Sequence, residues 1–253
     1  YPQYRTNTGV PVSASTQLEG TALQSRGGTQ RLSQVSGTVN SADGSVAISD
    51  GSATLSDPDR FDASGTLSNG AGATYQTRTD YGLSGYDYLT VGTLDYLAGG
   101  TSSTSSLVVI GVDTENADMP SQGIARYTGS MRADEIQGSS FQHYQSNQVV
   151  LDVDFGSHDA TLTAENFGVT SGGMNFDALT VSGIDITGNN LSGGTATTLS
   201  NGSPVTLYGS DATTSLSGTF YGFDTSIGAP DEAGGVFLVD GSNGQLMGYF
   251  VVD

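Results

Sequence analysis

The sequence predicts an all-β protein, with an N-terminal β-rich domain followed by a C-terminal eight-stranded antiparallel β-barrel. Three observations favour this fold class. No stretch of roughly ten or more residues has the i, i+3, i+4, i+7 apolar spacing of an amphipathic helix. Short runs of alternating apolar and polar residues recur instead, separated by turn-forming residues about every 8–12 positions. The 37 glycines provide the backbone freedom that many tight turns require.

The first 118 residues divide into an arm and a domain. Residues 1–30 show no strand pattern and are expected to form an irregular arm, whereas residues 31–118 are expected to form the β-rich domain. Short strands are predicted at Val35–Val39, Val46–Ile48 and Ala53–Leu55. The segment Leu107–Val112 is apolar on both faces, which is typical of a central strand that is covered on each side.

The alternation becomes regular over residues 119–253, where about eight antiparallel strands are expected. One strand carries Leu151, Val153 and Phe155 on one face and aspartates on the other. The apolar phase slips by one position at Gly183, which predicts a β-bulge there. Eight strands close into a barrel whose interior is filled by side chains, and closure removes exposed strand edges. A two-sheet sandwich is the competing architecture.

Composition and charge argue against several classes of function. The net charge is −19, and all seven basic residues are Arg, so the field around the protein repels nucleic acid and anionic lipid. The absence of Cys excludes disulfides and zinc–thiolate sites. No apolar run reaches the roughly 18 residues of a transmembrane helix. The start at Tyr1 rather than Met predicts an exported protein whose signal has been removed.

The sequence lacks the motifs of the common enzyme classes. It has no G-x-S-x-G elbow, no H-E-x-x-H pair and no Walker A loop. The segment that contains Asp57, Asp59 and Asp62 resembles a loose calcium-binding loop but lacks the Gly and the terminal Glu of such a loop. We therefore interpret these aspartates as solvated turn carboxylates. His158 follows a Gly-Ser pair and is interpreted as a turn residue. We therefore expect no catalytic residues and no metal site.

Five residues are candidates for ligand binding. His143 is expected in a polar loop beside Tyr144, and an exposed His next to aromatic rings is a candidate axial ligand for haem. Tyr81, Tyr86 and Tyr88 form a tyrosine-rich stretch of the kind that contacts proteins or porphyrins. The alternatives are an ordinary surface His and a half-buried aromatic cluster within the first domain.

Three segments carry a family resemblance when taken together. Residues 121–131 contain a G-x-A-x-Y-x-G core, residues 148–167 include a strand that closes on D-F-G, and residues 217–253 contain F-Y-G and then a Glu before Gly-Gly. In this order they resemble the C-terminal β-barrel of the transferrin-binding protein B superfamily of Gram-negative surface lipoproteins. The resemblance covers residues 107–253.

This resemblance implies a handle-like role for the domain at 31–118 and a scaffold role for Glu232. It also implies a non-enzymatic binding protein, secreted or on the outer-membrane surface, that captures iron, haem or another nutrient for an outer-membrane uptake receptor. The expected partners are therefore a protein or haem-type ligand and possible copies of the chain itself, not nucleic acid. The alternative function is a self-assembling coat protein in which the arm of residues 1–30 adds a strand to a neighbouring subunit.

Overall fold

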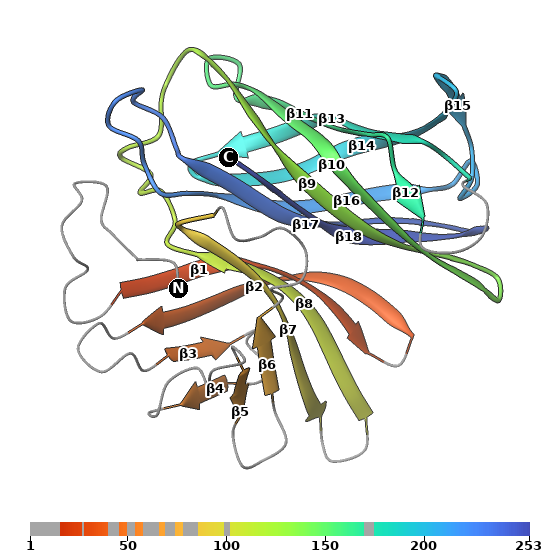
Figure 1. Cartoon of the computed structure of the whole chain (residues 1–253), viewed down its shortest axis with the longest axis horizontal. Coiled ribbons are helices and arrows are strands. Elements are labelled where there is room, and N and C mark those ends of the chain that lie inside the picture. Colours follow the sequence, from red (N-terminus) through yellow and green to blue (C-terminus); the bar gives the residue numbers. More distant parts are fainter. Residues whose placement is uncertain are drawn as a thin grey trace.

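A computed structural model describes most of the chain as two antiparallel sheets. The described residues are 16–26, 28–39, 46–49, 54–57, 66–68, 74–77, 86–98, 102–169 and 175–253. Their regular structure is made of strands, and this part of the chain has no helix of the length and hydrophobicity needed to cross a membrane. Figure 1 shows the N-terminal sheet lying against one side of a barrel.

The N-terminal sheet has eight strands in the order β4-β3-β2-β1-β8-β7-β6-β5, and it forms a half-barrel. Its strands are β1 (Thr16–Arg26), β2 (Thr29–Val39), β3 (Val46–Ser49), β4 (Thr54–Asp57), β5 (Thr66–Ser68), β6 (Thr74–Thr77), β7 (Leu89–Ala98) and β8 (Ser102–Gly111). The predicted strand at Leu107–Val112 falls largely in β8, which pairs with β1 and β7 at the centre of the sheet. Val108, Val109 and Ile110 are all fully buried, so the prediction that both faces are covered is confirmed.

The structure corrects the prediction that residues 1–30 form an irregular arm. Part of this segment forms strand β1, which pairs with β2 on one side and β8 on the other. The reason is that consecutive residues of β1 are buried from both faces, so no alternation appears in the sequence. Thr21, Ala22 and Leu23 are all buried. At Gly20 an added Cβ would lie 2.0 Å from the carbonyl oxygen of Val109, so the two strands require glycine there. Residues 1–15 lie outside the described residues.

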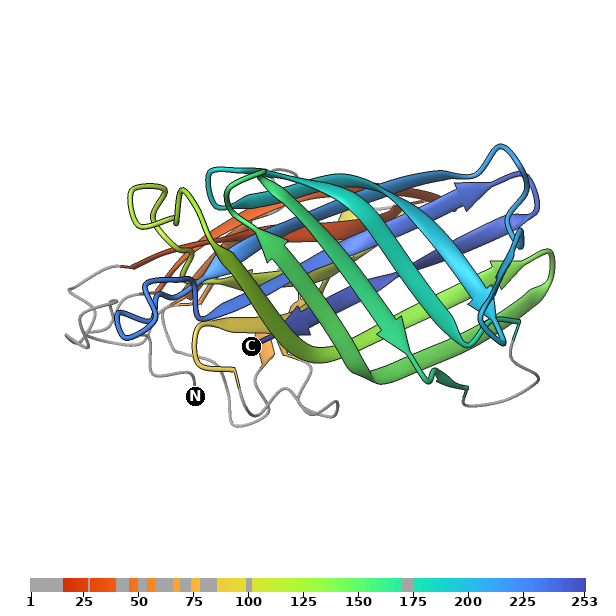
Figure 2. The ribbon, with the colours of Figure 1, turned by 90° about the horizontal axis from the view of Figure 1, so that it is seen from above.

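The C-terminal sheet closes on itself as an eight-stranded antiparallel barrel, as predicted, and it is not a sandwich (Figure 2). Its strands are β9 (Ile124–Gln137), β10 (Ser140–Asp154), β11 (Asp159–Glu165), β13 (Ala178–Thr187), β14 (Asn190–Ser200), β16 (Thr213–Tyr221), β17 (Glu232–Gly241) and β18 (Gly244–Val252). Each pairs with the next in this order, and β18 pairs with β9 to complete the ring. Short strands β12 (Gly168–Val169) and β15 (Ser203–Val205) pair with β10 and β14.

Side chains on the inward phase of these strands fill the barrel. Leu151, Val153 and Phe155 are buried while the aspartates between them are exposed, which confirms the predicted alternation. The bulge at Gly183 is also confirmed, because its φ is 67° and the pairing of β11 with β13 shifts register at this point. The ring of Tyr144 stacks on that of Phe176 with centroids 4.5 Å apart. The barrel interior is thus a packed core.

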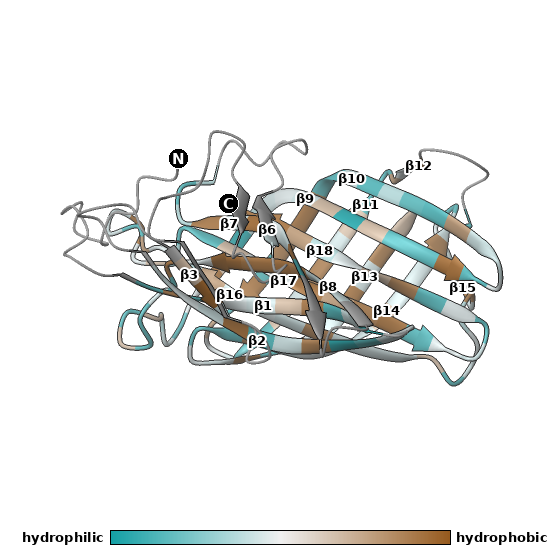
Figure 3. Ribbon diagram, turned by 90° about the horizontal axis from the view of Figure 1, so that it is seen from below, coloured by the Kyte–Doolittle hydropathy of each residue, from teal (hydrophilic) through white to brown (hydrophobic). Residues whose placement is uncertain are grey.

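The half-barrel packs on the outer face of β17 and β18. Side chains from both sheets form one apolar cluster: Leu23, Leu89, Val91, Val109, Tyr221, Val236, Leu238, Tyr249 and Val251. The first eight residues of β17 are therefore buried, from the barrel core on one side and from the half-barrel on the other. Figure 3 shows hydrophobic residues (brown) along this strand. Neighbouring residues of β16 divide in the same way, since Phe220 belongs to the barrel core and Tyr221 to the cluster shared with the half-barrel.

A glycine at the end of β16 allows a tyrosine of the other domain to approach. Gly222 has a φ of 62°, and an added Cβ would lie 2.4 Å from the Cδ2 atom of Tyr88. Only glycine therefore leaves room here for the ring of Tyr88. Gly202 shares the positive φ, at 75°, but its missing Cβ would meet nothing within 4 Å. Comparing substitutions at these two glycines therefore separates the effect of steric crowding from the effect of backbone strain.

We predict that Gly222→Ala lowers the free energy of unfolding by about 1–3 kcal/mol more than Gly202→Ala does. Both substitutions carry the cost of a positive φ, but only the first drives a methyl group into the Tyr88 ring. Urea denaturation of the two variants measures the difference. Equal losses of stability would show that the packing of Tyr88 on Gly222 contributes nothing.

Candidate interaction surface

The structure places two of the predicted ligand-binding tyrosines at the junction of the two domains. Tyr86 is half-buried, and its hydroxyl donates a hydrogen bond to the carbonyl oxygen of Val251 at 2.8 Å. Tyr88 is half-buried and packs on Gly222. Tyr81 lies outside the described residues. Both described tyrosines thus make structural contacts, and a role for any of the three in ligand binding stays a prediction.

His143 and Tyr144 lie on opposite faces of β10 and do not form one site. The structure corrects the expected loop, because a polar run of residues here continues a strand paired with β9. The half-exposed side chain of His143 points outward, with Nδ1 at 2.5 Å from Oδ1 of Asp134 and its ring edge-on to Phe141. Tyr144 is buried within the barrel. Strand alternation separates neighbouring residues in this way.

A buried carboxylate closes the barrel end at which Tyr144 lies. Glu135 of β9 is only 2% exposed and accepts hydrogen bonds from Tyr144 (2.9 Å), Tyr208 (3.0 Å) and the side-chain amide of Asn175 (2.8 Å). Burial raises the pKa of Tyr144 to about 12, and it raises the pKa of Tyr208 further, so both hydroxyls stay protonated and donate. Sequence reasoning missed this network, although Glu135 falls on the inward phase of β9 set by Tyr127.

Glu232 joins the barrel to the half-barrel. Its Oε2 accepts hydrogen bonds from the backbone N–H groups of Tyr88 (3.1 Å) and Leu89 (3.0 Å), and its Oε1 accepts one from Asp87. The expected scaffold role is therefore confirmed at this junction. Desolvation of the buried carboxyl group raises its pKa to about 7, and the three N–H donors oppose that rise.

Two large apolar side chains are exposed at the end of the barrel opposite Glu135. Ile124 begins β9 and is 85% exposed, while Ile227 lies in the loop between β16 and β17 and is 68% exposed. Two hydrogen bonds hold this loop: the backbone N–H of Asp224 donates to the carbonyl oxygen of Ala229, and the hydroxyl of Tyr127 donates to that of Pro230. Burying either isoleucine in a complex would gain about 1.5–3 kcal/mol.

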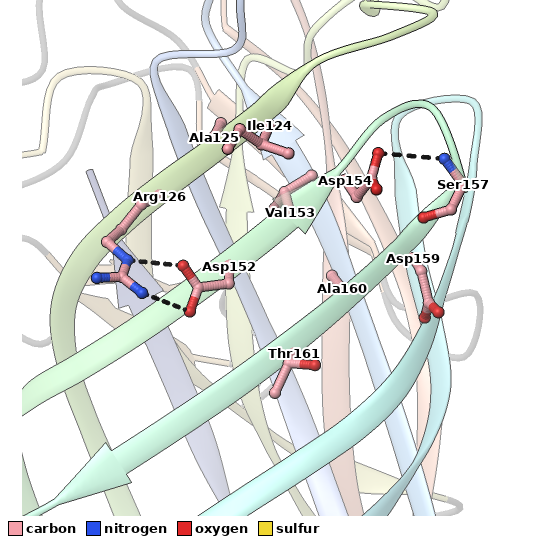
Figure 4. Close-up of a pocket in the computed structure, with 10 residues that line it drawn as sticks. All are labelled: Ile124, Ala125, Arg126, Asp152, Val153, Asp154, Ser157, Asp159, Ala160 and Thr161. Atoms are coloured by element: carbon pink, nitrogen blue, oxygen red, sulfur yellow. Dashed lines mark hydrogen bonds and ion pairs between the residues drawn. The ribbon is translucent and has the colours of Figure 1, made fainter.

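A hollow of about 600 Å³ lies beside Ile124 on the outer face of β9, β10 and β11 (Figure 4). Across it the guanidinium group of Arg126 makes a bidentate ion pair with Asp152, with N–O distances of 2.6 and 2.9 Å. Asp154 accepts hydrogen bonds from the backbone N–H groups of Ser157 and Gly156, which lower its pKa. The hollow is thus an open surface depression with charged walls, and sequence reasoning did not find it.

Comparison with known proteins identifies the family of the barrel. The profile of the family described as the C-lobe and N-lobe beta barrels of Tf-binding protein B matches residues 119–252, which is more than half of the chain. The chain belongs to this family. The match includes all eight barrel strands, and it excludes the half-barrel.

Solved structures of transferrin-binding protein B share this fold over both domains. The protein from Haemophilus parasuis aligns with a TM-score of 0.54 and 18% identity over 93% of this chain. The protein from Neisseria meningitidis aligns with a TM-score of 0.53 and 19% identity over 97% of this chain. The chain spans 44% of the length of each of these two structures. No curated protein sequence matches the chain.

We predict that the stability of this transferrin-binding-protein-B-family chain depends on pH through Glu232. Its folded pKa of about 7 exceeds the ordinary value of 4.5, so between these values the folded state binds more protons than the unfolded state. The Glu232 contribution is therefore fully present at low pH and declines as pH rises towards about 7. Chemical denaturation at pH 5 and pH 8 measures the change.

The variant Glu232→Gln cannot titrate, so we expect its free energy of unfolding to fall less between the two pH values than that of the native protein. Native and variant curves that fall in parallel would contradict the assignment of this titration to Glu232.

Proposed function

We propose that this protein is a non-enzymatic binding protein, secreted or displayed on the cell surface, that captures a protein ligand with the end of the barrel that carries Ile124 and Ile227. The observation that supports this most directly is the contrast between a filled barrel interior and two exposed isoleucines at one end. A ligand that uses these side chains must approach from outside.

The packing of the interior favours a macromolecular ligand over a small one in the lumen. Aromatic rings fill the barrel near both of its ends. Tyr144 and Phe176 lie near one end, and Tyr127, Phe155 and Phe220 lie near the other. Hydrogen bonds to Glu135 close the first of these ends. Larger barrels hold ligands in a cavity, whereas a filled eight-stranded barrel offers its outer wall and rim.

The family supports iron acquisition as the process. The two structural relatives are named as transferrin-binding proteins, and transferrin is an iron-carrying protein. We infer that the ligand here is an iron-carrying protein, delivered to an outer-membrane uptake receptor, and that the chain acts at a Gram-negative surface. The sequence identity to either relative is below 20%, so this inference rests on membership of the family and not on the individual relatives.

The self-assembly alternative is weakened by strand β1. It required residues 1–30 to pair with a neighbouring subunit, but Glu19–Arg26 already pair on both edges within the half-barrel. The segment before Glu19 remains for that role. Ligand capture is therefore the better-supported function.

We predict that the double variant Ile124→Ser/Ile227→Ser binds transferrin at least about tenfold more weakly than the native protein, because two apolar contacts are lost. Surface plasmon resonance with immobilised transferrin measures the affinity. Phe141→Ser is the matched control, since Phe141 is also an exposed large side chain, 52% exposed, but lies on β10 far from this end. Native protein that fails to bind transferrin would exclude it as the ligand, and equal affinity of the double variant would exclude this end.

Haem remains the second candidate ligand, with His143 as its proposed axial ligand. The Asp134 carboxylate beside Nδ1 is the kind of partner that orients a ligating imidazole, and the half-exposed Phe141 ring could contact a porphyrin. This arrangement would leave Nε2 to bind iron.

We predict that haemin added to the purified protein shifts its Soret absorption band, and that His143→Ala abolishes the shift. His158→Ala is the matched control, because His158 is an exposed His in a turn of the same barrel. A Soret band that is identical with and without protein would remove haem as a ligand.

A further inference from the structure

The half-barrel has an inner face of its own, which points away from the C-terminal barrel. Side chains alternate between the two faces of a strand, so the neighbours of Leu23 and Val109, which contact the barrel, lie on this inner face. Ala22 and Val108 are two of them, and neither is exposed to solvent. The edge strands β4 and β5 lie in contact with each other, so the sheet curls around this face and shields it.

The inner face changes from apolar to polar towards the hairpin that joins β1 and β2. Gln24 of β1 lies opposite Arg31 of β2 and Ser106 of β8 in the register of the sheet. In the neighbouring polar row, nearer to the hairpin, Arg26 lies opposite Thr104. These side chains therefore share one face. Gln24, Thr104 and Ser106 are each no more than 1% exposed, so this polar group is buried.

Three hydroxyl groups on this face are buried without a hydrogen-bond partner among the residues that the structure describes. They belong to Ser33, Thr104 and Ser106 and are called here the hydroxyl cluster. Ser33 shares the face because it pairs with Ala22. A buried hydroxyl group that forms no hydrogen bond costs stability, since it has lost its bonds to water and gained none in return. The cluster can donate these bonds to a polar ligand.

Two arginines lie on the same face as the hydroxyl cluster. Nε of Arg31 donates a hydrogen bond to Oε1 of Gln24 at 2.5 Å, which holds the guanidinium group on this face. Arg26 lies two residues beyond Gln24 on the same strand, and both arginines are exposed. Neither forms an ion pair with a carboxylate in the described part of the chain. Both guanidinium groups therefore have charge available for an anion.

The surroundings of these arginines contain few opposing charges, although the net charge of the chain is −19. No acidic residue occurs in the three rows of β1, β2 and β8 that run from Arg26 to Ala22. Asp95 of β7 pairs with Ser105 and therefore lies on the opposite face. Charges more than about 10 Å away are largely screened at ordinary salt concentration. Distant carboxylates therefore do not prevent an anion from binding here.

We propose that this polar face of the half-barrel binds a small tetrahedral oxyanion of the phosphate class. Arg26 and Arg31 supply positive charge and paired N–H donors, and Gln24 positions Arg31. The hydroxyl cluster donates to the remaining oxygens, which a tetrahedral anion has and a planar carboxylate lacks. A neutral ligand would leave the two arginines unused. This site goes beyond the capture of a protein ligand, since it lies on a different domain from Ile124 and Ile227.

Isothermal titration calorimetry of the full chain with inorganic phosphate, at constant ionic strength, tests the proposal. We expect saturable binding with a Kd of about 1 mM or tighter. Acetate should bind at least about fivefold more weakly, because it has fewer oxygens to accept hydrogen bonds, and chloride should give no saturable heat. A lack of phosphate binding, or equal binding of phosphate and acetate, would overturn the proposal.

The variant Arg31→Gln locates the site. It should weaken phosphate binding at least about tenfold, because one charged donor is lost. Arg126→Gln is the matched control, since it also removes one exposed arginine and changes the net charge equally, but lies on the barrel strand β9. Equal effects of the two variants would show that overall charge controls binding, which would contradict a site at Arg31.

The variant Ser106→Ala separates binding from folding. In phosphate-free protein its free energy of unfolding should equal or exceed that of the native protein, because an unbonded hydroxyl group is removed from the interior. Its phosphate binding should be at least about threefold weaker. Ser105→Ala, one residue away on the opposite face of β8, is the matched control and should change neither quantity. A Ser106→Ala variant that loses stability and binds phosphate as the native protein does would overturn the proposal.

Discussion

The burial of β17 on both faces is the constraint on which the arrangement of the two domains depends. Phe237 belongs to the barrel core, while Val236 and Leu238 belong to the cluster shared with the half-barrel. A strand of this kind cannot face water on either side without losing a large apolar area. The half-barrel therefore has one favourable position, over β17 and β18, while β10 and β11 lie further round the ring.

Polar contacts at the edge of this apolar interface fix its geometry. The carboxyl group of Glu232 accepts hydrogen bonds from three consecutive backbone N–H groups at the start of β7, and the hydroxyl of Tyr86 donates to the backbone of β18. Such contacts are directional, whereas apolar burial is not, so they specify one register between the domains. The loop that carries Ile227 ends directly at Glu232. Fixing the junction therefore also fixes one part of the candidate interaction surface.

The sequence predicted the barrel because inward side chains there are consistently apolar, as at Leu151 and Val153, and outward ones are polar. It could not predict β1, where burial from both faces removes the alternation. The five candidate site residues were chosen by their amino-acid type. Amino-acid type does not predict that the side chains of His143 and Tyr144 point in opposite directions. Ile124 resembles a core residue in sequence, and the pairing of Asp154 with Asp159 depends on the hairpin register, so the interaction surface required coordinates.

The two ends of the barrel differ in the side chains that they expose to water, and this difference indicates where a partner binds. Strands that end at a rim leave inward side chains near water. At one end Glu135 gathers two tyrosine hydroxyls and the amide of Asn175, so polar groups satisfy one another and the end is closed. At the other end Ile124 and Ile227 remain exposed although polar residues would cost the fold nothing there. Apolar surface kept exposed on an ordered rim is most simply explained by a partner that covers it.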